Sequence, residues 1–234
     1  MTSGRTGRAA LWISAVAAAL AVIPATTANA ATISAAGECC SFVGSPFPQA
    51  AGVKAELSNP GSPNTVPHNV YADTKGADGG PLFYSSLAGP GATVPVEGTE
   101  FLTPGSYRFR CTLHRGMNGV LAVSSGAAVP RPKVRPTIRS NSLSVVRKKG
   151  RIDLALQSGT STGPVTVTVT ANGSSAASAK VSSLRAGEVR RLSAKLSSKG
   201  RKTIARGSSV QIKVRAVAEF GSVGSASRNL RAGR

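Results

Sequence analysis

Hydrophobic residues beyond residue 30 fall in short stretches that alternate with polar residues and are separated by glycine and proline. In the first part of the chain, residues 31–125, no window keeps helical periodicity over three turns. This pattern predicts an all-β sandwich or barrel. The expected strands are 32–35, 53–57, 68–72, 93–96, 105–111 and 119–123. Pro95 marks 93–96 as an edge strand or a wrong assignment, because proline cannot donate to a ladder.

The second part, residues 137–234, shows a stronger alternation with a period of two. Seven strands are expected, at 143–146, 152–156, 165–169, 179–184, 189–196, 210–216 and 226–230. Seven short strands within about 100 residues are typical of an immunoglobulin- or fibronectin-III-like β-sandwich. Residues 126–136 join the two parts, and three prolines between residues 130 and 136 predict an extended linker there.

The first 30 residues have the features of a signal peptide. Arg5 and Arg8 precede an apolar run of 15 residues, and Ala28-Asn29-Ala30 supplies small residues for cleavage. The run is shorter than the roughly 20 residues of a membrane-spanning helix, although an uncleaved anchor is the alternative. We therefore expect an exported protein that is extracellular, periplasmic or associated with the cell wall.

The net charge of +20 is distributed unevenly. Residues 31–125 carry five basic and six acidic side chains, whereas residues 126–234 carry 22 basic and three acidic ones. The second part therefore suits an anionic cell-wall polymer, an acidic membrane surface or extracellular nucleic acid, although solubility alone is the simpler explanation. Phe220 is its only aromatic residue, which argues against sequence-specific nucleic-acid binding through base stacking.

Rare metal-binding residues gather in the stretch from Tyr107 to Met117. Cys111, His114 and Met117 are each separated by two residues, and after residue 30 the chain has only one other histidine, His68, and no other methionine. A soft thiolate, two imidazoles and a thioether form the ligand set of a blue-copper site. Alternation in the preceding strand places Tyr107 and Phe109 on the same face as Cys111, which would bury the thiol. Asn69 could hydrogen-bond beside the cysteine and hold the two ligand segments together.

These motifs resemble the plastocyanin/azurin family of cupredoxins across roughly residues 43–124. The resemblance rests on Pro67-His68-Asn69-Val70, the stretch from Pro104 to His114, and Met117 with Gly119 and Val123, and the short Cys-x-x-His-x-x-Met loop is similar to that of amicyanin. It implies a Greek-key β-sandwich with one type 1 copper. His68, Cys111 and His114 would be equatorial ligands and Met117 the axial one. The resemblance also implies an apolar patch around the edge of His114, for which Leu113 and Pro67 are candidates.

Cys39 and Cys40 leave several alternatives open. Adjacent cysteines can bridge each other only through a strained ring. An intermolecular disulfide, a thiol pair that binds metal transiently, and two buried thiols are the other interpretations, since exported proteins rarely leave thiols free.

The small number of histidines also limits the kinds of active site that the chain can form. Two histidines are too few for a second copper centre, and with both assigned to a metal none remains for a Ser/His/Asp arrangement. We expect a protein that is not an enzyme and carries single electrons to and from a redox partner. The alternatives are an extracytoplasmic copper carrier or buffer, and a cell-surface binding protein whose first part is only structural.

Overall fold

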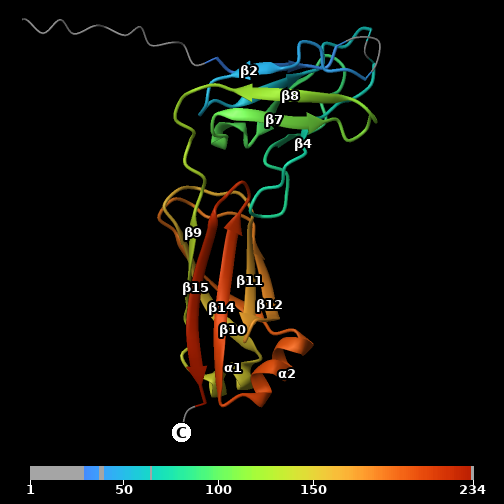
Figure 1. The fold of residues 1–234 in the computed structure, drawn as a ribbon. Coiled ribbons are helices and arrows are strands. Elements are labelled where there is room, and N and C mark those ends of the chain that lie inside the picture. Colours follow the sequence, from blue (N-terminus) through green and yellow to red (C-terminus); the bar gives the residue numbers. More distant parts are fainter. Residues whose placement is uncertain (1–28, 37–39, 64, 233–234) are drawn as a thin grey trace, which may run out of the picture.

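The computed structural model describes residues 29–36, 40–63 and 65–232, which form two β-rich units joined through residues 124–133 (Figure 1). The predicted all-β fold is confirmed, because strands dominate both units. Within the described residues, no helix is both long and apolar enough to cross a membrane.

The first unit is a single curved sheet with the strand order β1-β3-β6-β5-β4-β7-β8-β2. A backbone bridge between Ser34 and Val43 links β1 to the segment before β2, so the sheet closes on itself. Phe109 lies at the centre of the core, and its ring centroid is 4.9 Å from Phe42, 6.2 Å from Phe47 and 6.3 Å from Phe83. The elements are β1 Thr32–Ser34, β2 Phe47–Gln49, β3 Ala55–Ser58, β4 Tyr71–Ala72, β5 Tyr84–Ser85, β6 Thr93–Glu97, the 3-10 helix η1 Thr99–Phe101, β7 Gly105–Arg110 and β8 Asn118–Val123.

Strand β6 contains Pro95 and is nevertheless paired on both sides. Glu56 stands opposite Pro95 in β3, but it donates its N–H to Ala31 on the far side of β3. Glu56 and Pro95 therefore form a pair that exchanges no hydrogen bonds, and the missing N–H of proline interrupts nothing there. The expectation of an edge strand was wrong, since β5 also pairs with β6 at Val96 and Glu97.

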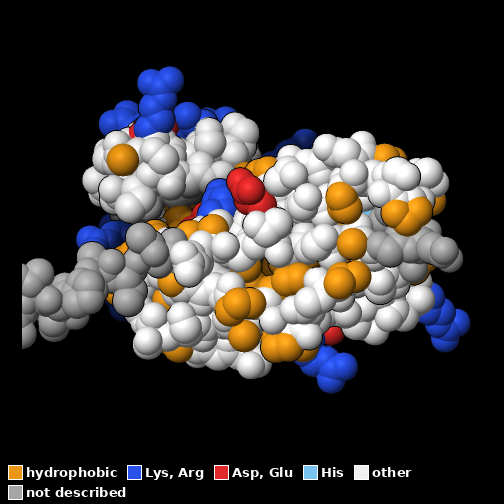
Figure 2. Space-filling model, turned by 90° about the horizontal axis from the view of Figure 1, so that it is seen from above, with side chains coloured by type: hydrophobic (Ala, Val, Ile, Leu, Met, Phe, Trp, Pro, Cys, Tyr) orange, Lys and Arg blue, Asp and Glu red, His pale blue; other side chains and the backbone are white. Residues whose placement is uncertain are grey.

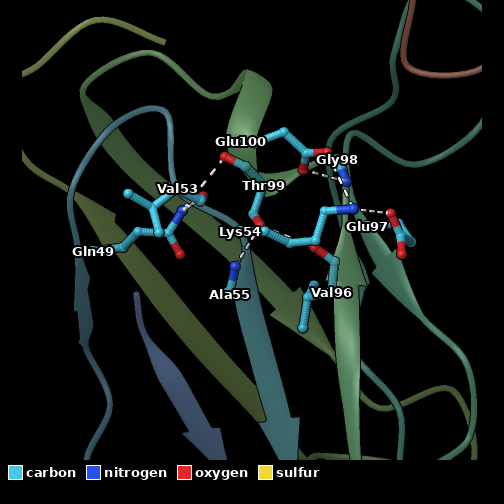
Figure 3. A network of polar contacts seen from close by, with 9 residues as sticks. All are labelled: Gln49, Val53, Lys54, Ala55, Val96, Glu97, Gly98, Thr99 and Glu100. Carbon is cyan, nitrogen blue, oxygen red and sulfur yellow. Dashed lines mark hydrogen bonds and ion pairs between the residues drawn. The ribbon is translucent and has the colours of Figure 1, made fainter. Parts of the chain in front are cut away.

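Helix η1 at the end of β6 is held by the network in Figure 3. The buried Thr99 hydroxyl accepts from the Ala55 N–H at 2.9 Å and donates to the Val96 carbonyl at 2.9 Å. Lys54 bridges Glu97 and Glu100, and their hydrogen bonds and charges raise its pKa even though partial burial acts to lower it. This network fixes the β6–β7 connection, and with it the start of β7.

The second unit packs two sheets around an aliphatic core. A three-stranded sheet has the order β13-β10-β9, and a four-stranded sheet has the order β12-β11-β14-β15. The elements are β9 Val134–Ile138, α1 Leu143–Lys149, β10 Arg151–Ser158, β11 Val165–Ala171, β12 Ser174–Val181, β13 Val189–Lys195, α2 Ser198–Arg206, β14 Ser209–Ala218 and β15 Val223–Arg231. Strand β9 begins inside the segment expected as linker, and as an edge strand it tolerates Pro136.

Residues 143–146 form the first turn of α1, so the expectation of a strand there was wrong. Leu143 and Val146 are buried at helical spacing, whereas Val145 is exposed. Gly150 ends the helix in the left-handed conformation at φ 62°, with its N–H bonded to the Val146 carbonyl. Glycine adopts this helix-ending conformation without the steric cost that other residues incur.

The two units meet at Phe220. Its ring lies between Tyr84 at 5.6 Å and Phe101 at 6.3 Å, measured between centroids. Arg131 donates to the Phe220 carbonyl at 2.9 Å and lies over the Phe101 ring. A Cβ atom on Gly98 would come within 2.7 Å of the Phe220 ring, so this contact requires glycine. Because several groups meet at this point, the units form a specific contact as well as a covalent connection.

Candidate metal centre

Three candidate ligands converge at the end of β7. The Cys111 sulfur lies 3.5 Å from Nδ1 of His114 and 4.0 Å from Nδ1 of His68. All three potential ligand atoms lie within 4.8 Å of one another, and the two imidazole centroids are 4.7 Å apart. His68 is 43 positions away in sequence, and tertiary folding brings it to the loop that carries the other two.

The loop between β7 and β8 is closed by its own backbone. Cys111 donates its N–H to the Met117 carbonyl at 3.0 Å, and Met117 donates to the His114 carbonyl at 3.3 Å. Strands β7 and β8 pair as far as Arg110 and Asn118, so the loop extends a regular hairpin. Met117 is buried in the core of the first unit. The hairpin thus keeps the three loop residues together at a free end of the unit (Figure 1).

Asn69 joins the His68 segment to this loop. Its Oδ1 accepts from the Thr112 N–H at 2.8 Å and lies 3.1 Å from the Thr112 hydroxyl. Asn69 and Thr112 each follow a candidate ligand directly in the chain. The pair of bonds therefore fixes the separation between His68 and Cys111.

Asn59 holds His68 from the other side, a role that the sequence did not reveal. His68 and Ala88 exchange backbone hydrogen bonds of 3.0 and 2.8 Å. The fully buried Asn59 donates through Nδ2 to the Ala88 carbonyl at 3.0 Å and to the Val66 carbonyl at 2.9 Å. Sequence alone gives no signal for this role, because an asparagine between Ser58 and Pro60 is typical of a surface turn.

Burial differs among the candidate ligands. His68 is fully buried and Cys111 and Met117 nearly so, whereas His114 is partly exposed. Burial, followed by the proximity of His114, lowers the pKa of His68. A lowered pKa favours the neutral imidazole, which is the form that binds a metal ion.

The spacing of these atoms fits one soft or borderline metal ion. Bonds of about 2.0–2.3 Å to nitrogen and sulfur allow a single ion to bridge donor atoms 3.5–4.0 Å apart. A thiolate with two imidazoles suits copper or zinc, and a methionine buried on the same loop favours copper. No carboxylate belongs to this cluster among the described residues.

Three exposed apolar residues lie next in sequence to residues that form or support the site. Leu113, next to His114, is 52% exposed, and Leu87, next to Ala88, is 53% exposed. Pro67 is also exposed. Figure 2, viewed from the end of the molecule formed by the first unit, shows apolar side chains scattered over that end.

Cys40 does not belong to this cluster of metal-binding residues. Cys111 is a free thiol, and Cys40 is disulfide-bonded. Cys39 lies outside the described residues, so the expectation for the Cys39–Cys40 pair stays a prediction.

Comparisons with known proteins give distant similarities. No known family and no curated protein matches the sequence. A solved structure of an oxidized amicyanin mutant is 20% identical to this chain. The match covers 41% of this chain and 82% of the amicyanin chain, with a TM-score of 0.33. A Cu(I) form of another amicyanin mutant is 19% identical, and the match covers 43% of this chain and 87% of the amicyanin chain, also with a TM-score of 0.33. A DUF3823 family protein from Parabacteroides merdae is 12% identical, and the match covers 87% of this chain and 98% of that protein, with a TM-score of 0.29. These similarities are too weak to assign the site, which is defined by its own geometry.

Proposed function

We propose that this protein is an exported type 1 copper protein that carries single electrons between redox partners and is not an enzyme. The observation that carries the proposal is the convergence of the Cys111 sulfur with the imidazoles of His68 and His114. Met117, buried on the same closed loop, would supply the weak axial ligand. Copper bound there would supply a one-electron couple.

A one-electron couple is served by ligands that keep their positions and by a site that excludes water, and the protein's own residues provide both. Asn69 and Asn59 hold His68 against the Cys111 loop from two sides, so the ligand positions change little when the charge of the site changes. Burial of His68, Cys111 and Met117 excludes water from all but one side of the site. His114, flanked by the exposed Leu113, is the ligand through which a partner protein would exchange electrons.

Reconstitution of the purified mature chain with cupric ion tests the proposal. We expect an intense visible absorption from thiolate-to-copper charge transfer. The Cys111→Ser variant should abolish it, because a hydroxyl is a poor copper ligand that cannot give this transition. Ser41→Ala is a control on an exposed hydroxyl and should leave the band unchanged. A colourless complex of the unaltered chain would contradict the proposal.

Copper delivery is the second candidate function, favoured by the partial exposure of His114. An exposed ligand allows metal to be exchanged with a partner as well as electrons. The two functions can be separated by following copper retention against a chelator through repeated redox cycles. Retention in both oxidation states supports electron transfer, whereas rapid loss on reduction supports delivery.

A further inference from the structure

The outward face of the three-stranded sheet in the second unit carries a row of cations. Side chains on this face alternate with the buried ones, and the register places Arg151 opposite Lys195, Ala155 opposite Arg191, and Gln157 opposite Arg135. The row continues past the end of β9, where the Arg139 N–H bonds to the Asp153 carbonyl. We call the exposed cations of this face the cationic track: Lys133, Arg135, Arg139, Arg151, Arg191 and Lys195.

The one carboxylate on this face is already engaged. Asp153 accepts from the Ser193 hydroxyl at 2.6 Å, and Arg151 and Lys149 lie 3.4 and 3.6 Å from its oxygens. The Ser193 hydrogen bond is the main cause of its lowered pKa, which keeps it ionised. Among the described residues, no ion pair joins the other five cations of the track to a carboxylate, so their charge is directed to solvent.

Two hollows lie along the track. One, of about 340 Å³, is lined by Arg131, Lys133, Arg135 and Gln157 at the end near the first unit. The other, of about 370 Å³, is lined by Arg139, Asp153, Arg191 and Ser193. Ala155 lies between them in the register of β10. The hollows therefore follow one another along β10, which lies behind β14 in Figure 1.

The opposite face of the same unit differs in character. Its hollow, of about 500 Å³, is lined by Thr168, Thr170, Lys213 and Arg215 together with apolar residues of β14 and β15. Arg215 is already bonded to the Ala77 carbonyl of the first unit. Lys213 is thus the only cation lining that hollow without such a contact, so this hollow offers less charge free to bind an anion than the two hollows on the track.

We propose that the cationic track binds an extended polyanion of the phosphodiester-linked polyol class. Same-side residues of a strand repeat at about 6.8 Å, so the track presents its cations at regular intervals along β10. Four of its six cations are arginines, whose planar guanidinium groups bind phosphate through paired hydrogen bonds. No aromatic side chain lies on the track, so it offers no platform for stacked bases. This partner goes beyond the electron-transfer function and does not depend on bound copper.

The proposal has a direct test with the full mature chain and lipid-free poly(glycerol phosphate) as the probe. The double variant Arg139→Gln/Arg191→Gln should weaken binding about tenfold and lower the slope of log K against log salt by roughly 1.5. The matched double variant Lys180→Gln/Lys213→Gln removes the same charge from the opposite face. It should weaken binding less than about threefold, since only longer-range attraction is lost.

Two further measurements keep the result interpretable. Arg139→Lys/Arg191→Lys should keep the salt slope but bind more weakly, because a lysine cannot form the paired hydrogen bonds. Unchanged circular dichroism in each variant shows that the fold is intact. Equal losses in the two glutamine double variants would overturn the proposal in favour of diffuse attraction. Tighter binding of oligo(dT) than of the polyol phosphate would overturn it in favour of nucleic acid.

Discussion

Both units are built mainly from β-strands but use their sequences in opposite ways. The first unit is nearly neutral and contains both histidines, the free cysteine and all three tyrosines of the chain. The second has no cysteine, histidine or tyrosine and carries an excess of 19 positive charges over residues 126–234. A metal site needs a few residues brought together in a buried place, whereas attraction to a polyanion needs many charges spread over a surface.

The difference extends to the cores. The first unit is built around an aromatic cluster centred on Phe109, and the second has a core of Val, Leu, Ile and Ala with no aromatic residue. Since all tyrosines belong to the first unit, tyrosine fluorescence of the mature chain reports on that unit alone. The comparison between the units can therefore be tested within the intact protein.

The largest expected effect is selective stabilisation by copper. A ligand present at a thousandfold excess over its Kd stabilises the folded state by about 4 kcal/mol. For a unit of this size, that corresponds to a rise in Tm of roughly 15 °C, followed by tyrosine fluorescence. The Cys111→Ser variant should show almost none of the rise. An equal rise in that variant would mean that copper acts elsewhere.

Asn69→Ala should destabilise the first unit by about 1–3 kcal/mol, because the Thr112 N–H and hydroxyl lose their acceptor. Denaturant unfolding followed by tyrosine fluorescence measures the loss, and the visible band should shift as the ligands loosen. Asn118→Ala is the matched control, since among the described residues the Asn118 side chain bonds only to the nearby Gly116 carbonyl. Equal effects of the two substitutions would contradict the role of Asn69 between the ligand segments.

Phe220→Ala should weaken the contact between the units by about 1–2 kcal/mol, as the ring contacts with Tyr84 and Phe101 are lost. The units should then unfold in separate calorimetric transitions, and the linker should be cleaved faster by protease. Phe220→Leu retains apolar bulk and should have a smaller effect. Unchanged cooperativity in the alanine variant would show that the other contacts suffice.

The smallest expected effect is a pH dependence of the same contact. The Tyr84 hydroxyl donates to Glu219 at 2.8 Å, and this bond, with burial and the nearby carboxylate, raises its pKa to about 12. The neutral tyrosine is favoured in the folded state, so this stabilisation is fully present below pH 10 and is lost between about pH 10 and 12. Ultraviolet titration of Glu219→Gln should give a lower pKa for Tyr84. An unchanged titration curve would show that Glu219 is not the cause.

Much of the candidate site could be recognised from sequence because its residues are chemically rare. Cys111, His114 and Met117 lie within seven positions, and His68 is the only other histidine, so residue type and spacing alone single them out. The strands around them were predictable for a similar reason. Alternation such as Tyr107-x-Phe109-x-Cys111 depends only on the geometry of an extended chain.

Other elements could not be predicted, because local patterns allow two structures. Leu143, Val145 and Val146 fit a strand as well as a helix, and burial of Leu143 and Val146 against the core selects the helix. Helix α2 buries only Gly200 and Ile204, so few apolar residues mark it in the sequence. In β9, prolines suggested a linker, and only a position at the edge of the sheet makes a strand compatible with Pro136.

The sequence by itself determined the all-β class, the division of charge and the identity of the candidate ligands, since these follow from residue type and short-range periodicity. Tertiary structure alone decided how His68 approaches Cys111, how Asn59 and Asn69 hold it, and how Phe220 joins the units. It also aligned cations from three strands and their flanking segments into one track. These features depend on contacts between residues that are distant in the chain, and no local pattern encodes such contacts.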